Sequence, residues 1–120
     1  MYKKTTIALL IMSSISCAET ENIVGIWTCK FESDYINADE NLTINKDQTY
    51  KKIVRLSFGP TMTDTGNWRL EKKQMVLHRH EHDNGKEKSK SDHEFKFTVS
   101  KLDKNNLVYK TDKATTTCTK

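Results

Sequence analysis

Apolar and polar residues alternate along most of the chain, with the period of two that sends successive side chains of a β-strand to opposite faces. The stretch IVGIWTCKFE, residues 23–32, is the first to show this pattern. One of its faces carries Ile23, Gly25, Trp27, Cys29 and Phe31. We therefore predict a first strand there, with that face turned toward a core.

Two hairpins are predicted next. In the first, NLTI (41–44) and TYKKIVRLSF (49–58) flank the turn NKDQ, where Asn45 and Asp47 can hydrogen-bond the local backbone. In the second, GNWRLEK and QMVLHRHEH meet at Lys72–Lys73. The segment between the hairpins, FGPTMTDTG (58–66), holds the only proline and two of the four glycines, which predicts a loop.

The C-terminal third continues the alternation after a polar interruption. DNGKEKSKSD (83–92) is highly charged and predicts an exposed connection. HEFKFTVS (93–100) alternates cleanly, and NNLVYKTD (105–112) and ATTTCTK (114–120) predict two more short strands. One face of the first of these three strands carries His93, Phe95, Phe97 and Val99. No stretch after the first 18 residues shows the spacing of an amphipathic helix.

About eight short strands at regular spacing define the fold class. This pattern favours an antiparallel barrel or sandwich, and eight strands is the size at which a barrel interior just fills or holds one small ligand. We predict an all-β protein: a small antiparallel up-and-down β-barrel over residues 19–120.

The N-terminus resembles a secretory signal peptide. Lys3 and Lys4 precede the apolar run Ile7–Ile15, and Ser16-Cys17-Ala18 offers small residues for cleavage. We expect residues 1–18 to be removed and the protein to be periplasmic or secreted. The alternative is a lipoprotein anchored at Cys17, although Ser14 stands where a lipobox usually has leucine. No other stretch approaches the ~20 apolar residues of a membrane span.

Removal of the signal peptide leaves two of the three cysteines, Cys29 and Cys118. In an oxidising compartment an even pair is most simply a disulfide. This disulfide would join the first strand to the last. In the loop-entropy model such a bridge contributes about 4–5 kcal/mol.

Two Gly-x-Trp pairs carry a resemblance to small bacterial lipocalin-like (calycin-type) domains. In those domains one such pair opens the barrel, an Asp-rich turn precedes an aromatic-bearing strand, and a second pair begins the next hairpin. The matching residues here are Gly25, Trp27, Asp47, Tyr50, Gly66 and Trp68. The resemblance implies a barrel, but the chain is shorter than a ligand-binding lipocalin, which leaves less room for a deep cavity. Fold analogy supplies no ligand.

Aromatic residues of the predicted strands are the candidates for a ligand site in the barrel mouth. They are Trp27, Tyr50, Trp68, Phe95 and Phe97. The simpler interpretation of Trp27 and Trp68 is that they only fill the core.

Histidines form the second candidate site. His78, His80 and His82 alternate along one strand, and His93 lies on the next. Imidazole suits zinc or copper, but three ligands at alternate positions span about 13 Å. Only two of them would therefore reach one ion, with His93 or Asp83 added. Because Met75 and Leu77 outnumber Val76, we expect the three histidines to face outward, as the solvated end of a strand.

Charge and motifs exclude other classes of function. The net charge is +4, and loss of Lys3 and Lys4 leaves +2, spread among interspersed acids and bases. Such a surface does not indicate nucleic-acid binding. No nucleophile elbow, zincin motif or phosphate loop is present, so we expect no enzyme activity and no cofactor.

Three hypotheses remain. The first is a non-catalytic binding protein that holds a small apolar or amphipathic ligand. The second is an inhibitor or immunity-type protein that binds a secreted enzyme or toxin. The third is a periplasmic metal-binding protein that uses the histidine strand.

Overall fold

The computed structural model describes residues 17–120. The predicted signal peptide lies almost entirely outside this range, so cleavage after Ala18 and lipidation of Cys17 stay predictions. No helix within residues 17–120 is long and apolar enough to cross a lipid bilayer.

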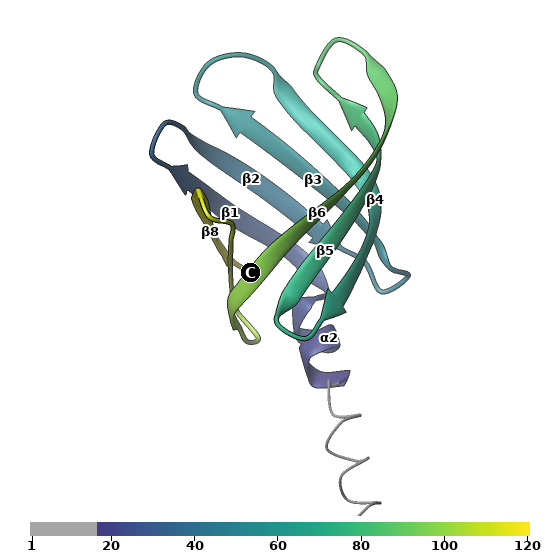
Figure 1. Cartoon of the computed structure of the whole chain (residues 1–120), viewed down its shortest axis with the longest axis vertical. Helices are drawn as coiled ribbons and strands as arrows, with labels where there is room; N and C mark the ends of the chain where they lie inside the picture. Colours follow the sequence, from purple (N-terminus) through teal and green to yellow (C-terminus); the bar gives the residue numbers. More distant parts are fainter. Residues whose placement is uncertain (1–16) are drawn as a thin grey trace, which may run out of the picture.

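Eight antiparallel strands close into a barrel in the order of the sequence, which confirms the predicted fold class (Figure 1). A short helix, α2 (Cys17–Ile23), precedes them. The strands are β1 (Gly25–Ser33), β2 (Asn37–Ile44), β3 (Thr49–Leu56), β4 (Thr61–Glu71), β5 (Gln74–Asp83), β6 (Lys88–Leu102), β7 (Asn106–Lys110) and β8 (Ala114–Thr119). Both predicted hairpins, β2–β3 and β4–β5, are present.

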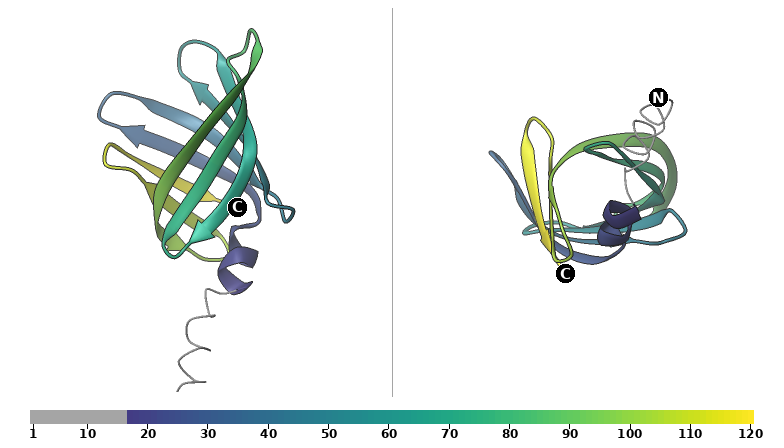
Figure 2. Two further views of the ribbon diagram at one scale, coloured as in Figure 1. Left: turned by 45° about the vertical axis from the view of Figure 1, so that its right-hand side comes forward. Right: turned by 90° about the horizontal axis from the view of Figure 1, so that it is seen from below.

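The helix corrects the prediction that the first strand includes Ile23. Ile23 ends α2 and its side chain is fully buried in the core. Two contacts hold the helix below the barrel (Figure 2): the Trp27 indole donates to the Ile23 carbonyl at 2.8 Å, and the Lys120 ammonium donates to the Asn22 carbonyl at 2.7 Å. A cation at a helix C-terminus is electrostatically favourable.

Two predicted loops are largely strand. Thr61–Gly66 belongs to β4, because Pro60 precedes the strand instead of interrupting it. Lys88–Asp92 belongs to β6, where Lys88 and Lys90 lie opposite Asp83 and Glu81 of β5. Opposite charges on paired strands stabilise a hairpin that looks too polar to be a strand in sequence.

The disulfide between Cys29 and Cys118 is present and confirms the prediction. The two residues are direct partners in the β1–β8 pairing, and both side chains are buried. The bridge closes the barrel between its first and last strands, which are 89 residues apart in sequence.

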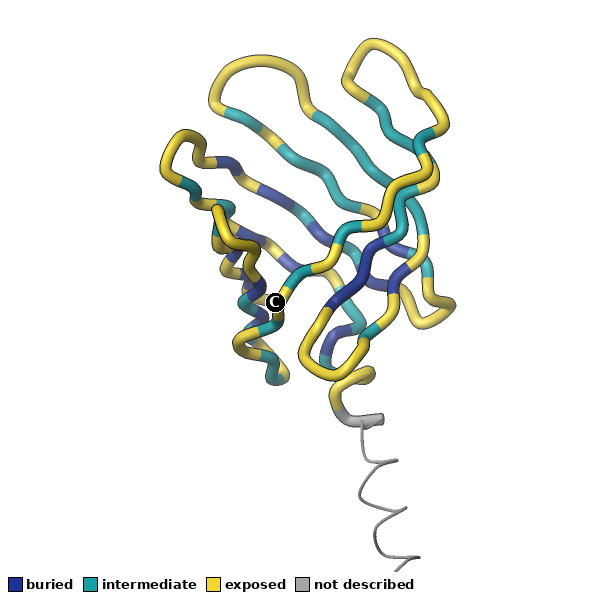
Figure 3. The backbone as a smooth tube through the Cα atoms, in the orientation of Figure 1, coloured by how far each residue is buried: buried dark blue, intermediate teal, exposed yellow. Residues whose placement is uncertain are grey.

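The core fills the end of the barrel next to α2 (Figure 3). The most deeply buried apolar side chains there, each at most 1 % exposed, are Ile23, Trp27, Leu42, Ile44, Met75, Leu77 and Leu107. We call this the closed end. Toward the other end the backbone changes from buried to intermediate and exposed positions along β3, β4, β5 and β6.

Candidate functional site: the open half of the barrel

Inward-facing side chains away from α2 are partly exposed to water. In β3 the buried Tyr50 is followed on the same face by Lys52 and Val54, which are only partly buried. β4 runs antiparallel to β3, so the order of burial along it is opposite: Met62 and Asp64 are partly exposed, and Trp68, closer to α2, is buried. The barrel interior is therefore accessible to solvent in this half.

We call this region the barrel mouth and define it by the inward-facing residues that line it. They are Glu40, Lys52, Val54, Met62, Asp64, Arg79, Phe95 and Phe97. A separate hollow of about 400 Å³ lies beside the upper ends of β1, β2 and β3, where Phe31, Ala38 and Leu56 are among the lining residues.

Aromatic rings follow the inner wall along β6. His93 contacts Phe95 edge-on at 4.4 Å between ring centroids, and Phe95 is parallel to Phe97 at 6.4 Å. Phe97 contacts Tyr109 edge-on at 4.9 Å. These offset and edge-to-face contacts are the arrangements that aromatic rings favour. They give the mouth one continuous apolar wall.

Lys52 and Glu40 form the first charged group in the mouth. The Tyr109 hydroxyl donates to Glu40 Oε1 at 3.0 Å, and Lys52 Nζ lies 3.9 Å from the same oxygen. Lys52 Nζ also lies 4.9 Å from the Phe97 centroid, a cation–π contact. Burial, together with the negative charge of Glu40, raises the pKa of Tyr109 well above its ordinary value. Tyr109 is therefore a hydrogen-bond donor throughout the neutral range.

Asp64 is the centre of the second charged group. Its carboxylate accepts from Nδ1 of His82 at 2.5 Å and lies 3.5 Å from Arg79 Nη1. The Arg79 guanidinium also donates twice to Ser91 Oγ and lies 5.2 Å from the Phe95 centroid. Burial and the Asp64 charge raise the pKa of Tyr50, while Arg79 opposes the shift.

Arg79 and Lys52 differ in the number of hydrogen-bond acceptors that the protein gives them. Arg79 has a carboxylate and a hydroxyl as partners. Lys52 has three N–H donors, yet its nearest carboxylate oxygen is 3.9 Å away, beyond hydrogen-bond distance. The Lys52 ammonium thus retains donor capacity that it directs into a half-buried space.

The structure separates the five predicted ligand residues. Phe95 and Phe97 lie in the mouth. Trp27, Tyr50 and Trp68 lie toward the closed end, all buried, and the Trp68 indole donates to the Asn45 carbonyl at 2.8 Å. Sequence reasoning missed Glu40, Lys52, Asp64 and Arg79. Lys52 and Arg79 carried one signal, a place on the same face as Tyr50 and Leu77 in predicted strands. Glu40 and Asp64 carried none, because both lie outside the predicted strands.

A β-bulge corrects the prediction that His78, His80 and His82 share the outer face. Arg79 pairs with Gly66 and Glu81 pairs with Thr65, so His80 is an extra residue in β5. The bulge reverses the alternation beyond it. His78 and His80 consequently lie together on the outer wall, while His82 turns inward to Asp64.

Asp92 of β6, a residue that sequence reasoning did not select, completes this outer group. Its carboxylate accepts a hydrogen bond from Nε2 of His78, which lowers the pKa of Asp92. The potential ligand atoms of His78, His80 and Asp92 all lie within 4.8 Å of one another. Neither His93 nor Asp83, the additional ligands expected from the sequence, belongs to this group.

Structural comparison identifies the fold. A lipocalin-like protein from Bacteroides uniformis superposes with a TM-score of 0.59 over 82 % of this chain and 98 % of its own, at 14 % sequence identity. The chain has a lipocalin-like fold. No family model and no curated protein sequence matches it. The predicted resemblance is confirmed at the level of fold.

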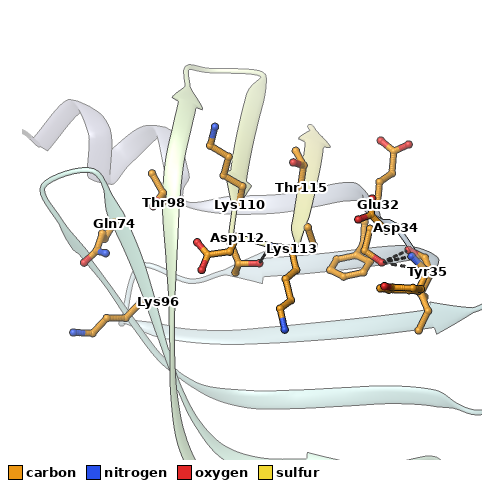
Figure 4. A pocket seen from close by; sticks show the side chains of 15 residues that line it. Glu32, Asp34, Tyr35, Gln74, Lys96, Thr98, Lys110, Asp112, Lys113 and Thr115 are labelled. Atoms are coloured by element: carbon orange, nitrogen blue, oxygen red, sulfur yellow. Dashed lines mark hydrogen bonds between the residues drawn. The ribbon is translucent and has the colours of Figure 1, made fainter.

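The wall of this lipocalin-like barrel opens on one side. Above the pair Thr98–Lys110, β6 leaves β7 and pairs only with β5. A broad cleft of about 1540 Å³ lies there, lined by residues 31–36, residues 110–115, Gln74, Lys96 and Thr98. Figure 4 shows three acidic and three basic side chains around it: Glu32, Asp34, Asp112, Lys96, Lys110 and Lys113. None of the residues that line the mouth belongs to this cleft.

Proposed function

We propose that this protein is a non-catalytic binding protein whose barrel mouth takes a small amphipathic ligand with an acidic head group. The observation that carries the proposal is the half-buried Lys52 ammonium, which lies beside the partly exposed Phe97 ring. A ligand carboxylate would supply the hydrogen-bond acceptor that Lys52 lacks. Its apolar body would cover Phe95 and Phe97.

Two further features support the proposal. Binding sites for small molecules are mostly apolar, with a few polar groups that fix orientation, and the mouth has this composition. Its charged side chains are also held in place: Tyr109 fixes Glu40, and Ser91 and Asp64 fix Arg79. Such preorganisation lowers the entropic cost of binding.

Calorimetric titration with three probes of equal chain length tests the proposal. The probes are dodecanoate and dodecyltrimethylammonium, each below its micelle concentration, and dodecanol below its solubility limit. We expect dodecanoate to bind most tightly, with one molecule per protein. Equal affinity for all three probes, or no binding, would contradict an acidic ligand.

Lys52→Met is the decisive variant, because it removes the ammonium and keeps an apolar stem. A hydrogen bond to a charged group contributes about 1.5–3 kcal/mol, so the variant should bind dodecanoate at least about tenfold more weakly. Lys51→Met is the matched control, since Lys51 is exposed on the outer face of the same strand. It should bind as the wild type does.

We also propose export to the periplasm or the outside of the cell. The Cys29–Cys118 disulfide supports this location, because disulfides persist in oxidising compartments. The mass of the protein recovered from cells distinguishes cleavage after Ala18 from acylation at Cys17. A mass equal to that of the whole chain would contradict both.

A further inference from the structure

The outer wall of the barrel carries a second group of side chains that the mouth does not use. His78 and His80 stack with their ring centroids 4.8 Å apart and their planes 24° from parallel. Asp92 reaches the same point from the neighbouring strand. His78 precedes the bulge in β5, His80 is the bulged residue, and Asp92 of β6 lies opposite His80.

The bulge is what brings these residues together. Side chains two residues apart in a regular strand are separated by about 6.6 Å, too far for close ring stacking. In β6, Ser91 and Asp92 lie opposite the single residue His80, between the pairs Arg79–His93 and Glu81–Lys90. Bulges often redirect side chains next to functional sites.

We propose that His78, His80 and Asp92 form a surface site for one divalent transition-metal ion, Zn²⁺ or Cu²⁺. Two imidazoles and one carboxylate match the three protein ligands of many zinc sites, in which the fourth position stays open to water. Imidazole favours zinc, copper and nickel over magnesium or calcium.

Small side-chain movements suffice to reach coordination geometry. A tetrahedral ion with ligand bonds of ~2.0–2.1 Å holds its ligand atoms about 3.3 Å apart, and the three ligand atoms here already lie within 4.8 Å. The side chains can move, since those of His78 and Asp92 are 37 % and 84 % exposed. The His78–Asp92 hydrogen bond already places a nitrogen and an oxygen together, and the ion would replace the proton between them.

Asn67 of β4 orients the third ligand. Its Oδ1 lies 2.6 Å from Nε2 of His80. Because an amide oxygen only accepts hydrogen bonds, Nε2 carries the proton and Nδ1 keeps its lone pair for a metal. Such second-layer partners are typical of histidines that bind metals.

A zinc titration against a chromophoric chelator measures this site directly. We expect one equivalent of Zn²⁺ to bind. His78→Gln, His80→Gln and Asp92→Asn should each weaken binding at least about tenfold, since loss of an outer partner alone costs about 10–100-fold. His93→Gln is the matched control: it removes one exposed imidazole of β6 that lies outside the group and should keep wild-type affinity.

Co²⁺ provides an independent readout. Tetrahedral inner-sphere Co²⁺ has intense visible absorption, which should appear in the wild type and in His93→Gln and be absent from Asp92→Asn. Circular dichroism confirms that each variant is folded. No bound equivalent, or unchanged affinity in a folded His78→Gln/His80→Gln variant, would overturn the proposal. Neither result bears on the proposed dodecanoate site, because His78, His80 and Asp92 lie outside the mouth.

Discussion

Gly66 shows how one residue determines the geometry of two sites. A Cβ atom at this position would lie 1.9 Å from the backbone oxygen of His78. Only glycine therefore lets β4 approach β5 at the bulge. In the sequence, Gly66 stood out as part of a Gly-x-Trp pair. Its structural role is close backbone approach, which keeps His80 outside and His82 inside.

Gly66→Ala is expected to destabilise the protein by about 3 kcal/mol, because the clash is with backbone and cannot be relieved by a rotamer change. Chemical denaturation measures the loss. Gly59→Ala is the control: its Cβ meets nothing within 4 Å, and its positive φ of 92° costs only about 1 kcal/mol. Equal losses in the two variants would contradict this role of Gly66.

Tyr109 should make stability depend on pH in the alkaline range. Its pKa in the folded protein is raised well above the ordinary value of 10.0. The stabilisation is therefore fully present below pH 10 and is lost as the pH rises from 10 toward the folded-state pKa, because the unfolded chain ionises first. The loss steepens as the unfolded tyrosine ionises and approaches about 1.4 kcal/mol per pH unit above pH 11.

Tyr109→Phe removes this contribution. Between pH 10 and 11, its free energy of unfolding should fall by about 1 kcal/mol less than that of the wild type, because the unfolded tyrosine is already half ionised at pH 10. Tyr35→Phe changes an exposed side chain and should keep the wild-type slope. Identical slopes for wild type and Tyr109→Phe would show that Tyr109 is not buried as described.

Residue patterns predicted only the apolar part of the mouth. Phe95 and Phe97 followed from clean alternation in HEFKFTVS. Lys52 did not, because alternation normally assigns charged residues to the outer face. Its inward place depends on an acid from another strand, Glu40, and on the Phe97 ring. Such a partnership between distant residues leaves no trace in a local pattern.

Among the elements, strands were predictable where one face is apolar and the other polar. In β6 this condition holds only for the second half, and the first half was predicted as a loop. Its upper part pairs on one side only, with β5, and its residues Lys88 and Lys90 make it resemble a loop in sequence. Lysines on an unpaired strand edge also prevent association with other strands. The same polar composition thus fits an edge strand as well as a loop.

The disulfide between β1 and β8 should contribute strongly to the stability of the barrel. Replacing Cys29 and Cys118 together by alanine should lower the free energy of unfolding by about 4–5 kcal/mol, because the bridge no longer restricts the unfolded chain. The reduced wild type keeps both sulfur atoms and is the matched control. It should lose a similar amount, measured by denaturation with and without reductant. A loss below about 1 kcal/mol in both would mean that strand pairing alone closes the barrel.

The whole molecule has one buried end and one partly exposed end. The closed end, with α2 below it and the disulfide in its wall, buries most of the core. The mouth leaves Phe95, Phe97 and the charged side chains of Lys52, Asp64 and Arg79 partly exposed to water. A barrel of eight strands can hold one small ligand, and the partly exposed inward-facing side chains lie at one end.

Methyl-group NMR during a dodecanoate titration tests the binding site most directly. Val54 and Met62 report on the mouth, Ile44 and Met75 on the closed end, and the exposed Ile26 on the outer wall. Signals of Val54 and Met62 should shift to saturation, while those of Ile44, Met75 and Ile26 should stay in place. Shifts confined to Ile26, or no shift at any of these residues, would contradict a ligand site in the barrel mouth.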